Sequence, residues 1–177
     1  EIIASHLEAV AFAKDYLSIP IHRKFNTIVT SAAGYPLDST YYQTIKGMVV
    51  PYQILQPGGD LIIASECAEG IGSAEFRKAQ QTLVRKGVTA FCAEIAQKAY
   101  ASVDEWQTQM QTKIMNVGRV HLYSTGLSAA DHNLTGVNVI DNLDEFVRSR
   151  VINNLESLGE PSLAVIPEGP YVVPMLI

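Results

Sequence analysis

Short runs of β-branched and aliphatic residues recur along this chain, and single helical patterns separate most of them. Each run spans four to seven residues, which is the length of a buried strand. Two neighbouring strands joined through one helix run parallel, because a tight turn cannot connect them. We therefore expect a largely parallel sheet covered by helices. The expected strands are residues 26–31, 61–64, 117–123, 137–140, 163–166 and 171–175.

The predicted fold class is α/β, a three-layer sandwich around a mainly parallel, Rossmann-like sheet. We expect residues 1–177 to form one domain, since domains commonly hold about 100–200 residues. The chain starts at Glu1, without Met, inside what already reads as a helix. We therefore expect it to be a piece of a longer protein.

Local patterns place the ends of the first helices. Ser5 and Glu8 have the spacing of a capping box, and Pro20 is expected to close the helix that follows. Asp38 is expected to cap a second helix that runs to about residue 52. Residues 57–60 contain proline and two glycines, which predicts a turn before the second strand.

Later helices are expected from residue 73, over residues 88–100, and after residues 141–142. Ser102 and Glu105 form another capping-box pattern. The helix that they begin is expected to pack through one apolar stripe, which consists of Val103, Trp106, Met110 and Ile114.

Composition excludes several classes of function. The formal net charge is −5 and the basic residues are scattered, which argues against a nucleic-acid partner. No apolar stretch approaches the roughly 18–20 residues of a membrane-spanning helix. The two cysteines, Cys67 and Cys92, fit free thiols in a reducing compartment, so we expect a cytoplasmic location.

The loop after the first strand is the first candidate site. Ligands of open parallel sheets bind beyond the carboxyl ends of the strands, and the start of the next helix offers unpaired N–H groups to an anion. Tyr42, Gln43 and Lys46 lie on the first turns of that helix. A phenol, an amide and an ammonium group can together hold a carboxylate or phosphate. The structural alternative is that Tyr42 is a core residue and that Gln43 and Lys46 are merely solvated.

The loop over residues 65–73 is the second candidate. Gly70-Ile71-Gly72 followed by Glu75 lacks the third glycine of the dinucleotide fingerprint, which makes it a weak indication of NAD binding. Cys67 has no His or basic neighbour in sequence to lower the pKa of its thiol, so we expect a plain packed or semi-exposed thiol and not a nucleophile.

The histidines do not indicate a metal site. His6, His22, His121 and His132 show no pair at metal-ligand spacing, and no Cys/His cluster exists. His121 lies in an apolar strand and is expected to be a satisfied core histidine. We expect no catalytic residue and no metal ligand in this chain, and no cofactor bound by it alone.

The first loop and its helix resemble the C-terminal domain of the nickel-dependent lactate racemase family. The resemblance extends across most of the chain. One departure is Ala32-Ala33, where glycine often stands in the family. The segments that carry the resemblance are His6-Leu7-Glu8-Ala9-Val10, Thr30 to Asp38, Tyr42-Gln43, Lys46-Gly47, Pro57-Gly58-Gly59, Glu69-Gly70-Ile71-Gly72, Glu75-Phe76, Trp106-Gln107 and Ile166-Pro167-Glu168-Gly169.

The resemblance implies a two-domain 2-hydroxy acid racemase or epimerase. Such an enzyme transfers hydride to and from a nickel-pincer nucleotide, and its N-terminal domain carries the histidines, the nickel ligand and the lysine that attaches the cofactor. The C-terminal domain supplies the substrate-facing positions, here Tyr42, Gln43, Lys46 and Trp106. The implied partners are a small 2-hydroxy acid and the N-terminal domain, which this chain lacks.

Three functions therefore stay open. The first is the substrate-carboxylate-binding domain of such a racemase, inactive alone. The second is a stand-alone module that binds a small organic anion, or serves in assembly, without catalysis. The third is a nucleotide-binding oxidoreductase domain that uses the Gly70 loop. The sequence also leaves open whether the protein forms a homo-oligomer.

Overall fold

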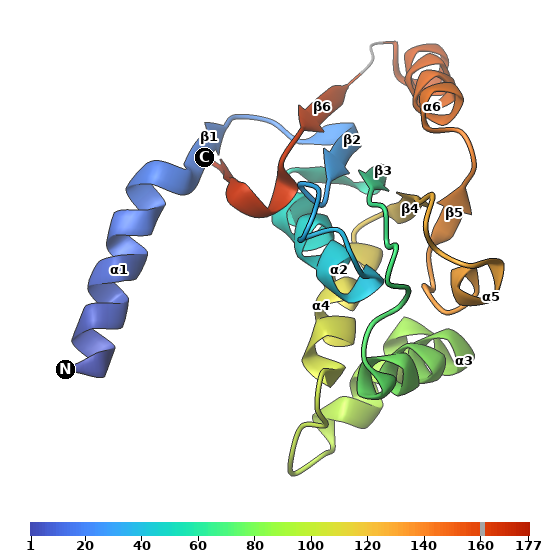
Figure 1. Ribbon diagram of the computed structural model, residues 1–177. Coiled ribbons are helices and arrows are strands. Elements are labelled where there is room, and N and C mark those ends of the chain that lie inside the picture. Colours follow the sequence, from blue (N-terminus) through green and yellow to red (C-terminus); the bar gives the residue numbers. More distant parts are fainter. Residues whose placement is uncertain (160–161) are drawn as a thin grey trace.

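The computed structural model describes residues 1–159 and 162–177, and its centre is a five-stranded parallel sheet (Figure 1). The strand order is β5-β4-β3-β2-β6, and every neighbouring pair is parallel. The strands are β2 (Phe25–Ser31), β3 (Leu55–Ala64), β4 (Arg119–Tyr123), β5 (Asn138–Ile140) and β6 (Leu163–Ile166).

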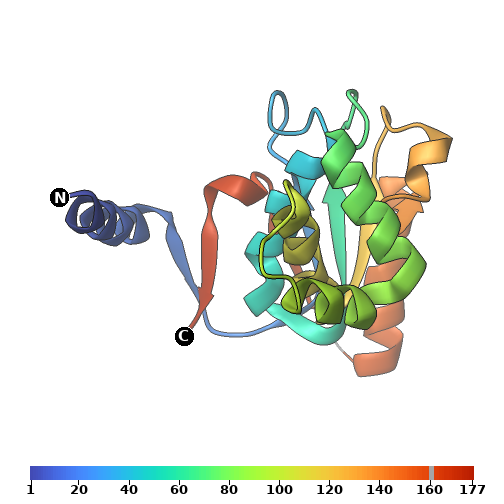
Figure 2. The ribbon, with the colours of Figure 1, turned by 90° about the horizontal axis from the view of Figure 1, so that it is seen from below.

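Helices cover both faces of this sheet, which confirms the three-layer α/β prediction (Figure 2). One face bears α2 (Tyr41–Val49), α3 (Ala74–Ala96) and α4 (Glu105–Met115). The other bears α6 (Leu143–Leu158), whose Phe146 ring lies 4.6 Å from the His121 ring. A four-residue helix, α5 (Ala129–His132), lies between β4 and β5.

The hydrophobic core lies between the sheet and the first group of helices. Alternate strand residues point to this side, because successive side chains of a strand face opposite ways. Ile28, Leu61, Ile63 and Leu122 supply it from the sheet, and Tyr41, Ile45, Met48 and Phe76 are among the helical residues that meet them.

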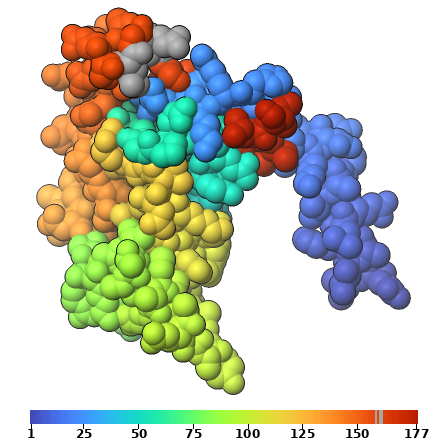
Figure 3. Space-filling model, turned by 180° about the vertical axis from the view of Figure 1, so that it is seen from behind, coloured from blue at the N-terminus to red at the C-terminus, as the bar shows by residue number. Residues whose placement is uncertain are grey.

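The two ends of the chain form a second, smaller sheet. β1 (Ser18–Ile21) pairs in parallel with β7 (Val173–Leu176), and the short helices η1 (Val50–Gln53) and η2 (Gly169–Tyr171) lie near it. Pro20 was expected to end the first helix, but it lies inside β1. The helix itself, α1 (Ile2–Leu17), extends away from the rest of the molecule (Figures 1 and 3).

Two expected helix caps are wrong. α1 begins at Ile2, before Ser5, so the Ser5–Glu8 capping box does not form. α2 is capped by Thr40, whose hydroxyl accepts a hydrogen bond from the Gln43 N–H at 3.3 Å. Asp38 instead bridges two loops, because its backbone carbonyl accepts the Cys67 N–H at 2.7 Å.

The expected turn at residues 57–60 is a bulge inside β3. Phe25 pairs with Leu55 and Thr27 pairs with Asp60, so the residues between Leu55 and Asp60 loop out of the ladder. Gly58 has φ +76°, and a Cβ on Gly59 would meet the Asn26 carbonyl oxygen at 2.7 Å. The glycines here allow two backbone segments of the sheet to approach each other closely. The sequence pattern does not distinguish such a bulge from a turn.

The later helices also differ from expectation. The helix predicted over residues 88–100 continues from α3 across a break at Gly87, where φ is +77°, and it ends at Ala96. The expected apolar stripe of α4 is half right. Met110 and Ile114 pack in or against the core, but Val103 precedes the helix and is 69% exposed, and Trp106 is 49% exposed. The buried α4 residues are mostly polar, namely Glu105, Gln107, Thr108, Gln111, Thr112 and Ile114. The strand expected over residues 61–64 begins earlier, at Leu55, and β1 was not expected. The other strand predictions are confirmed within two residues.

No helix in the described ranges combines the length and the apolar character needed to cross a bilayer.

A polar cluster lies beneath α6. Asp60 is 2% exposed, and its carboxylate accepts two hydrogen bonds from the Arg119 guanidinium at 2.8 and 2.9 Å. His121 Nε2 lies 2.8 Å from the same carboxylate, and Asn138 Nδ2 lies 2.9 Å from His121 Nδ1. His121 is therefore a satisfied core histidine, as expected. Burial alone would raise the pKa of Asp60, but the hydrogen bonds from His121 and Arg119 outweigh it and hold that pKa well below its usual value.

This cluster predicts acid sensitivity. A carboxyl group whose pKa is lowered by folding adds stability above its unfolded pKa of about 3.9, and that stability is lost as the pH falls below about 5. Asp60→Asn should lower the free energy of unfolding near pH 7 by about 3 kcal/mol and flatten its decline toward acid pH. Urea unfolding at a series of pH values measures both effects. The control is Asp144→Asn, which removes the exposed Asp144–Arg148 pair and should change little. Equal effects of the two variants would contradict the prediction.

Candidate functional site

The helices α2 and α4 bring the predicted site residues to one side of the molecule. Tyr42, Gln43 and Lys46 lie on α2, which follows the loop at the carboxyl end of β2. Trp106 lies in the first turn of α4. The two helices pack against each other, so residues distant in sequence become neighbours.

The start of α2 is closed by the Gly70 loop. The Tyr41 N–H donates to the Gly70 carbonyl at 2.9 Å, and the Tyr42 N–H donates to the Ile71 carbonyl at 3.0 Å. The N–H groups of Gln43 and Thr44 donate to Thr40. The expectation that unpaired N–H groups at this helix start could hold an anion is therefore wrong.

The same contacts give the Gly70 loop a structural role. Two of its carbonyl groups cap α2, and a Cβ on Gly72 would meet Tyr42 Cβ at 3.0 Å. A loop that caps a helix in this way does not form an open binding site for a pyrophosphate. The geometry does not favour the nucleotide-binding alternative.

Tyr42 is half-buried between aromatic rings and packs against the hydrophobic core. Its ring meets Phe76 edge-on at 5.1 Å and Trp106 edge-on at 6.2 Å between centroids. Burial raises the pKa of Tyr42, and the neighbouring Asp104 carboxylate raises it further. The phenol is therefore neutral at physiological pH.

Trp106 is displayed by a helix that is anchored through polar contacts. The next residue, Gln107, is 1% exposed and its side-chain amide donates to the Tyr42 carbonyl at 2.8 Å. Because Gln107 faces inward, Trp106 faces outward beside Tyr42. The alternative that Trp106 packs in the core is excluded by its 49% exposure.

Lys46 and Trp106 border one surface hollow of about 340 Å³, which we call the Lys46 hollow. Lys46 is exposed, so its ammonium group is available to a ligand. The hollow is otherwise mostly apolar. Its remaining lining residues are Val49, Val50, Tyr52, Gln53, Gln107, Met110, Val173 and Pro174.

Gln43 does not line the Lys46 hollow. Its amide oxygen is buried and accepts no hydrogen bond from the part of the chain that the structure describes. The structure thus brings Lys46 and Trp106 to one hollow and sets the Tyr42 ring against Trp106, while neither Tyr42 nor Gln43 lines the hollow.

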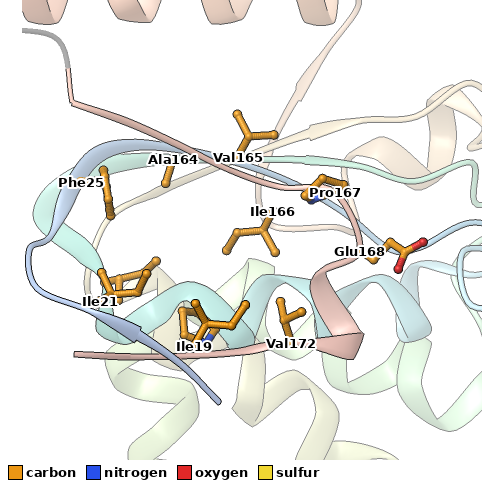
Figure 4. A pocket seen from close by; sticks show the side chains of 11 residues that line it. Ile19, Ile21, Phe25, Ala164, Val165, Ile166, Pro167, Glu168 and Val172 are labelled. Atoms are coloured by element: carbon orange, nitrogen blue, oxygen red, sulfur yellow. The ribbon is translucent and has the colours of Figure 1, made fainter. Parts of the chain in front are cut away.

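A second cavity, of about 310 Å³, lies between β6 and the β1–β7 pair (Figure 4). Ile19, Ile21, Phe25 and Ile166 give it apolar walls, and Glu168 is the one charged residue among its lining residues. The described residues that line it include no cationic side chain that could hold an organic anion. The candidate site is therefore on α2 and α4.

The remaining candidate groups are structural. Cys67 is fully buried, with its sulfur 3.4 Å from the Thr44 hydroxyl, which confirms a packed thiol. Within residues 1–159 and 162–177, no three His, Cys, Asp or Glu side chains gather closely enough to hold a metal ion. The described residues therefore do not fit a nickel centre.

Sequence reasoning missed three residues that support the site. Gln107 enters the sequence analysis only through the family resemblance, Ser73 only as the start of a helix, and Asp104 has no assigned role. Ser73 donates to the Asp104 carboxylate at 2.6 Å, next to Tyr42. No sequence pattern joins the three residues, because Ser73 caps α3 whereas Asp104 and Gln107 lie at the start of α4, about thirty residues later.

Comparison with known proteins decides the family. A family model described as "Lactate racemase C-terminal domain" matches residues 22–173. The chain belongs to the lactate racemase C-terminal domain family. The matched range contains all four predicted site residues and leaves α1 outside.

Similarities to individual known proteins are consistent with this family assignment. The lactate racemase of Thermoanaerobacterium thermosaccharolyticum is 36% identical over 72 residues, which are 41% of this chain and 17% of that protein. The structure of the lactate racemase apoprotein from the same organism superposes with a TM-score of 0.78 at 23% identity, covering 96% of this chain and 40% of that one. A protein from Thermotoga maritima superposes with a TM-score of 0.56 at 13% identity, covering 99% and 42%. The two structures support the fold, and this chain spans well under half of each relative's length.

The Lys46 hollow can be tested with Trp106, the sole tryptophan of the chain. A nearby ammonium group raises the local concentration of anions. Lys46→Met should therefore weaken quenching of Trp106 fluorescence by iodide while leaving quenching by neutral acrylamide unchanged. The control, Lys14→Met on α1, should change neither. If iodide quenching is the same in Lys46→Met and in the unaltered chain, the ammonium group does not border the indole in solution.

Proposed function

We propose that this chain is the substrate-carboxylate-binding domain of a two-domain 2-hydroxy acid racemase or epimerase. The observation that carries the proposal is that Trp106 borders the Lys46 hollow together with Lys46 and also meets the Tyr42 ring edge-on. A cation, a neutral phenol and an aromatic wall suit a small organic anion that carries a hydroxyl group. The family membership supports the same reaction class.

Each residue has a role that its chemistry supports. Lys46 anchors the substrate carboxylate by a charge-assisted hydrogen bond, which is stronger than a neutral one. Gln43 adds an amide contact after a change of side-chain rotamer, since its amide oxygen is buried and unpaired among the described residues. Tyr42 contacts the substrate through its hydroxyl group, and Trp106 forms an apolar wall that keeps water away.

The cofactor belongs to another part of the longer protein under this proposal. The nickel-pincer nucleotide that the resemblance implies supplies the hydride acceptor when bound. The residues of this chain, under the same proposal, act on the substrate. They bind its carboxylate, orient it and shield it from water.

α1 supports the existence of a partner domain. None of its residues is buried, and Leu7, Phe12 and Tyr16 are each more than 60% exposed. Apolar side chains occupy most of its circumference, which is typical of a helix that is covered on several sides. The upstream part of the longer protein is the covering surface that we propose.

The role of Lys46 is tested in the longer polypeptide with its cofactor loaded. Lys46→Ala should lower kcat/KM for racemisation of a 2-hydroxy acid by the equivalent of about 1.5–3 kcal/mol, the value of a hydrogen bond to a charged group. Lys113→Ala, on the exposed side of α4, is the matched control and should leave kcat/KM unchanged.

Two outcomes would contradict the proposal. Normal kinetics in Lys46→Ala would remove the anchor of the carboxylate. Binding of 2-hydroxy acids without any turnover in the loaded longer polypeptide would favour the stand-alone anion-binding module instead.

The role of α1 is tested by comparing two lengths of chain. Leu7→Glu should change the free energy of unfolding of this chain by no more than about 0.5 kcal/mol, because Leu7 is 62% exposed. In the longer polypeptide the same change should lower the melting temperature clearly. Ile152→Glu on α6, at 53% exposure, is the control and should behave alike at both lengths. Equal behaviour of Leu7→Glu at both lengths would argue against a covering domain.

A further inference from the structure

The Lys46 hollow extends along the two helices that carry the candidate site. Lys46 and Val49 line it from α2, and Trp106 and Met110 line it from α4. Residues three or four positions apart lie on one face of a helix, so each pair spans about one turn, or about 5.4 Å along the helix axis. Tyr42 meets Trp106 but lies outside the hollow. The hollow therefore runs from Lys46 and Trp106 in the direction away from Tyr42.

The walls beyond Lys46 are mainly apolar. Val50 from η1 and Val173 and Pro174 from β7 continue the apolar wall to which Met110 belongs. Among the described residues that line the hollow, Lys46 alone carries a charge. The hollow thus combines one cation with an apolar wall made of several side chains.

The other polar side chains of the hollow already have partners. The Gln107 amide donates to the Tyr42 carbonyl at 2.8 Å, and the Gln53 amide donates to the Tyr52 hydroxyl at 3.1 Å. A polar ligand group that is placed against the apolar wall loses water without gaining a matching partner, which is unfavourable. The hollow therefore favours apolar ligand atoms everywhere except beside Lys46.

The volume of the hollow exceeds what a three-carbon acid fills. It measures about 340 Å³, which lies within the range of about 300–1,000 Å³ of pockets that hold drug-sized ligands. An acid whose carboxylate meets Lys46 and whose side chain is a single methyl group leaves most of the apolar wall in contact with water. Each further methylene group that the wall covers strengthens binding about four-fold. The geometry therefore favours a longer apolar chain.

The cavity between β6 and the β1–β7 pair does not offer this combination (Figure 4). Its walls are also apolar and its volume is similar, about 310 Å³, but the charged residue that lines it is Glu168. A carboxylate repels an organic acid instead of binding it. Of these two hollows, the one beside Lys46 suits an apolar chain that ends in a carboxylate.

We infer that the Lys46 hollow holds the side chain of the substrate, and that the substrates are 2-hydroxy acids with an unbranched apolar side chain of about four carbons or more. An extended chain advances about 1.2 Å per bond, so about four to five carbons span one helical turn. The carboxylate meets Lys46, and the chain lies against Val49, Met110 and Val173. A side chain that carries a second carboxylate is disfavoured, because its charge would lose water against apolar walls.

The identity of the ligand as a 2-hydroxy acid rests on the proposed function. The fit of an alkyl carboxylate to the hollow does not, because it concerns residues of this chain alone. Two different measurements test these two statements.

Binding is measured on this chain through Trp106, its sole tryptophan. 2-Hydroxyhexanoate should shift the Trp106 emission to shorter wavelength, because its chain replaces water beside the indole, and it should bind about fifty-fold more tightly than lactate. The control ligand is 1,2-hexanediol, which has the same chain without the carboxylate and should bind about ten-fold more weakly than 2-hydroxyhexanoate. Lys46→Met should remove the difference between the acid and the diol.

Three results of this binding measurement would overturn the inference. The first is no emission shift with 2-hydroxyhexanoate. The second is equal affinity for 2-hydroxyhexanoate and lactate, because the apolar wall would then contribute nothing. The third is equal affinity for the acid and the diol in the unaltered chain, because Lys46 would then not anchor the carboxylate.

Selectivity is measured in the loaded longer polypeptide. The value of kcat/KM should rise about two- to four-fold per methylene group from lactate through 2-hydroxybutanoate to 2-hydroxyhexanoate. Malate has as many carbons as 2-hydroxybutanoate but ends in a second carboxylate, so it should be the poorer substrate of the two.

Val173→Phe fills part of the hollow with a side chain that a strand accommodates. It should lower the ratio of kcat/KM for 2-hydroxyhexanoate to kcat/KM for lactate about ten-fold, which corresponds to lost contact with about two methylene groups. Leu176→Phe is the matched control and should leave the ratio unchanged. Leu176 lies on the same strand, is 42% exposed where Val173 is 44% exposed, and does not line the hollow.

The outcomes separate the inference from the proposed function. Turnover of lactate that equals or exceeds turnover of 2-hydroxyhexanoate would overturn the inference and leave the proposed function intact. The same result together with a Trp106 shift in this chain alone would mean that a side chain of the upstream domain fills the hollow instead. Absence of turnover with every 2-hydroxy acid would overturn the proposed function, while the Trp106 measurement would still decide whether the hollow holds an alkyl carboxylate.

Discussion

The buried face of α4 is held by directional hydrogen bonds, and the arrangement of the candidate site depends on them. The Gln107 amide donates to the Tyr42 carbonyl at 2.8 Å, and the Gln111 amide donates to the Thr135 carbonyl at 2.7 Å. Gln80 on α3 donates to the Gln111 side chain at 2.9 Å. Apolar contacts between helices tolerate small rotations, whereas buried amides must meet their partners in one geometry. This constraint fixes the rotation of α4, and so it fixes the side on which Trp106 is displayed.

A second constraint acts on α2 from the Gly70 loop. Its carbonyl groups satisfy the first N–H groups of the helix, and Gly72 leaves room for Tyr42 to lie against it. The site therefore consists of side chains displayed by helices whose ends and rotations are both determined. Lys46 is the exception, because its ammonium group is exposed. Such a surface suits the binding of a small anion that we propose, through one flexible cation beside an aromatic wall, and it supplies no acid–base pair of its own.

Much of the fold could be predicted from local patterns. The β-branched runs correspond to β2, β4, β5 and β6, and the single helices between strands correctly imply a parallel sheet. The errors share one cause. Residues 57–60 have turn chemistry but form a bulge, and the polar α4 residues have the composition of an exposed face but are buried. In both places the outcome depends on a partner that is distant in sequence, such as Asn26 for Gly59 and Tyr42 for Gln107.

The sequence by itself determined the layer architecture and the identity of the candidate residues, because hydrophobic periodicity and a conspicuous family motif are local properties of the chain. Tyr42, Gln43, Lys46 and Trp106 could all be named in advance. Only the tertiary structure decided that Trp106 lies beside Tyr42, that the start of α2 is closed and that Asp104 turns its carboxylate away from its own helix. These properties arise from hydrogen bonds between separate elements, whose geometry exists only after the chain has folded.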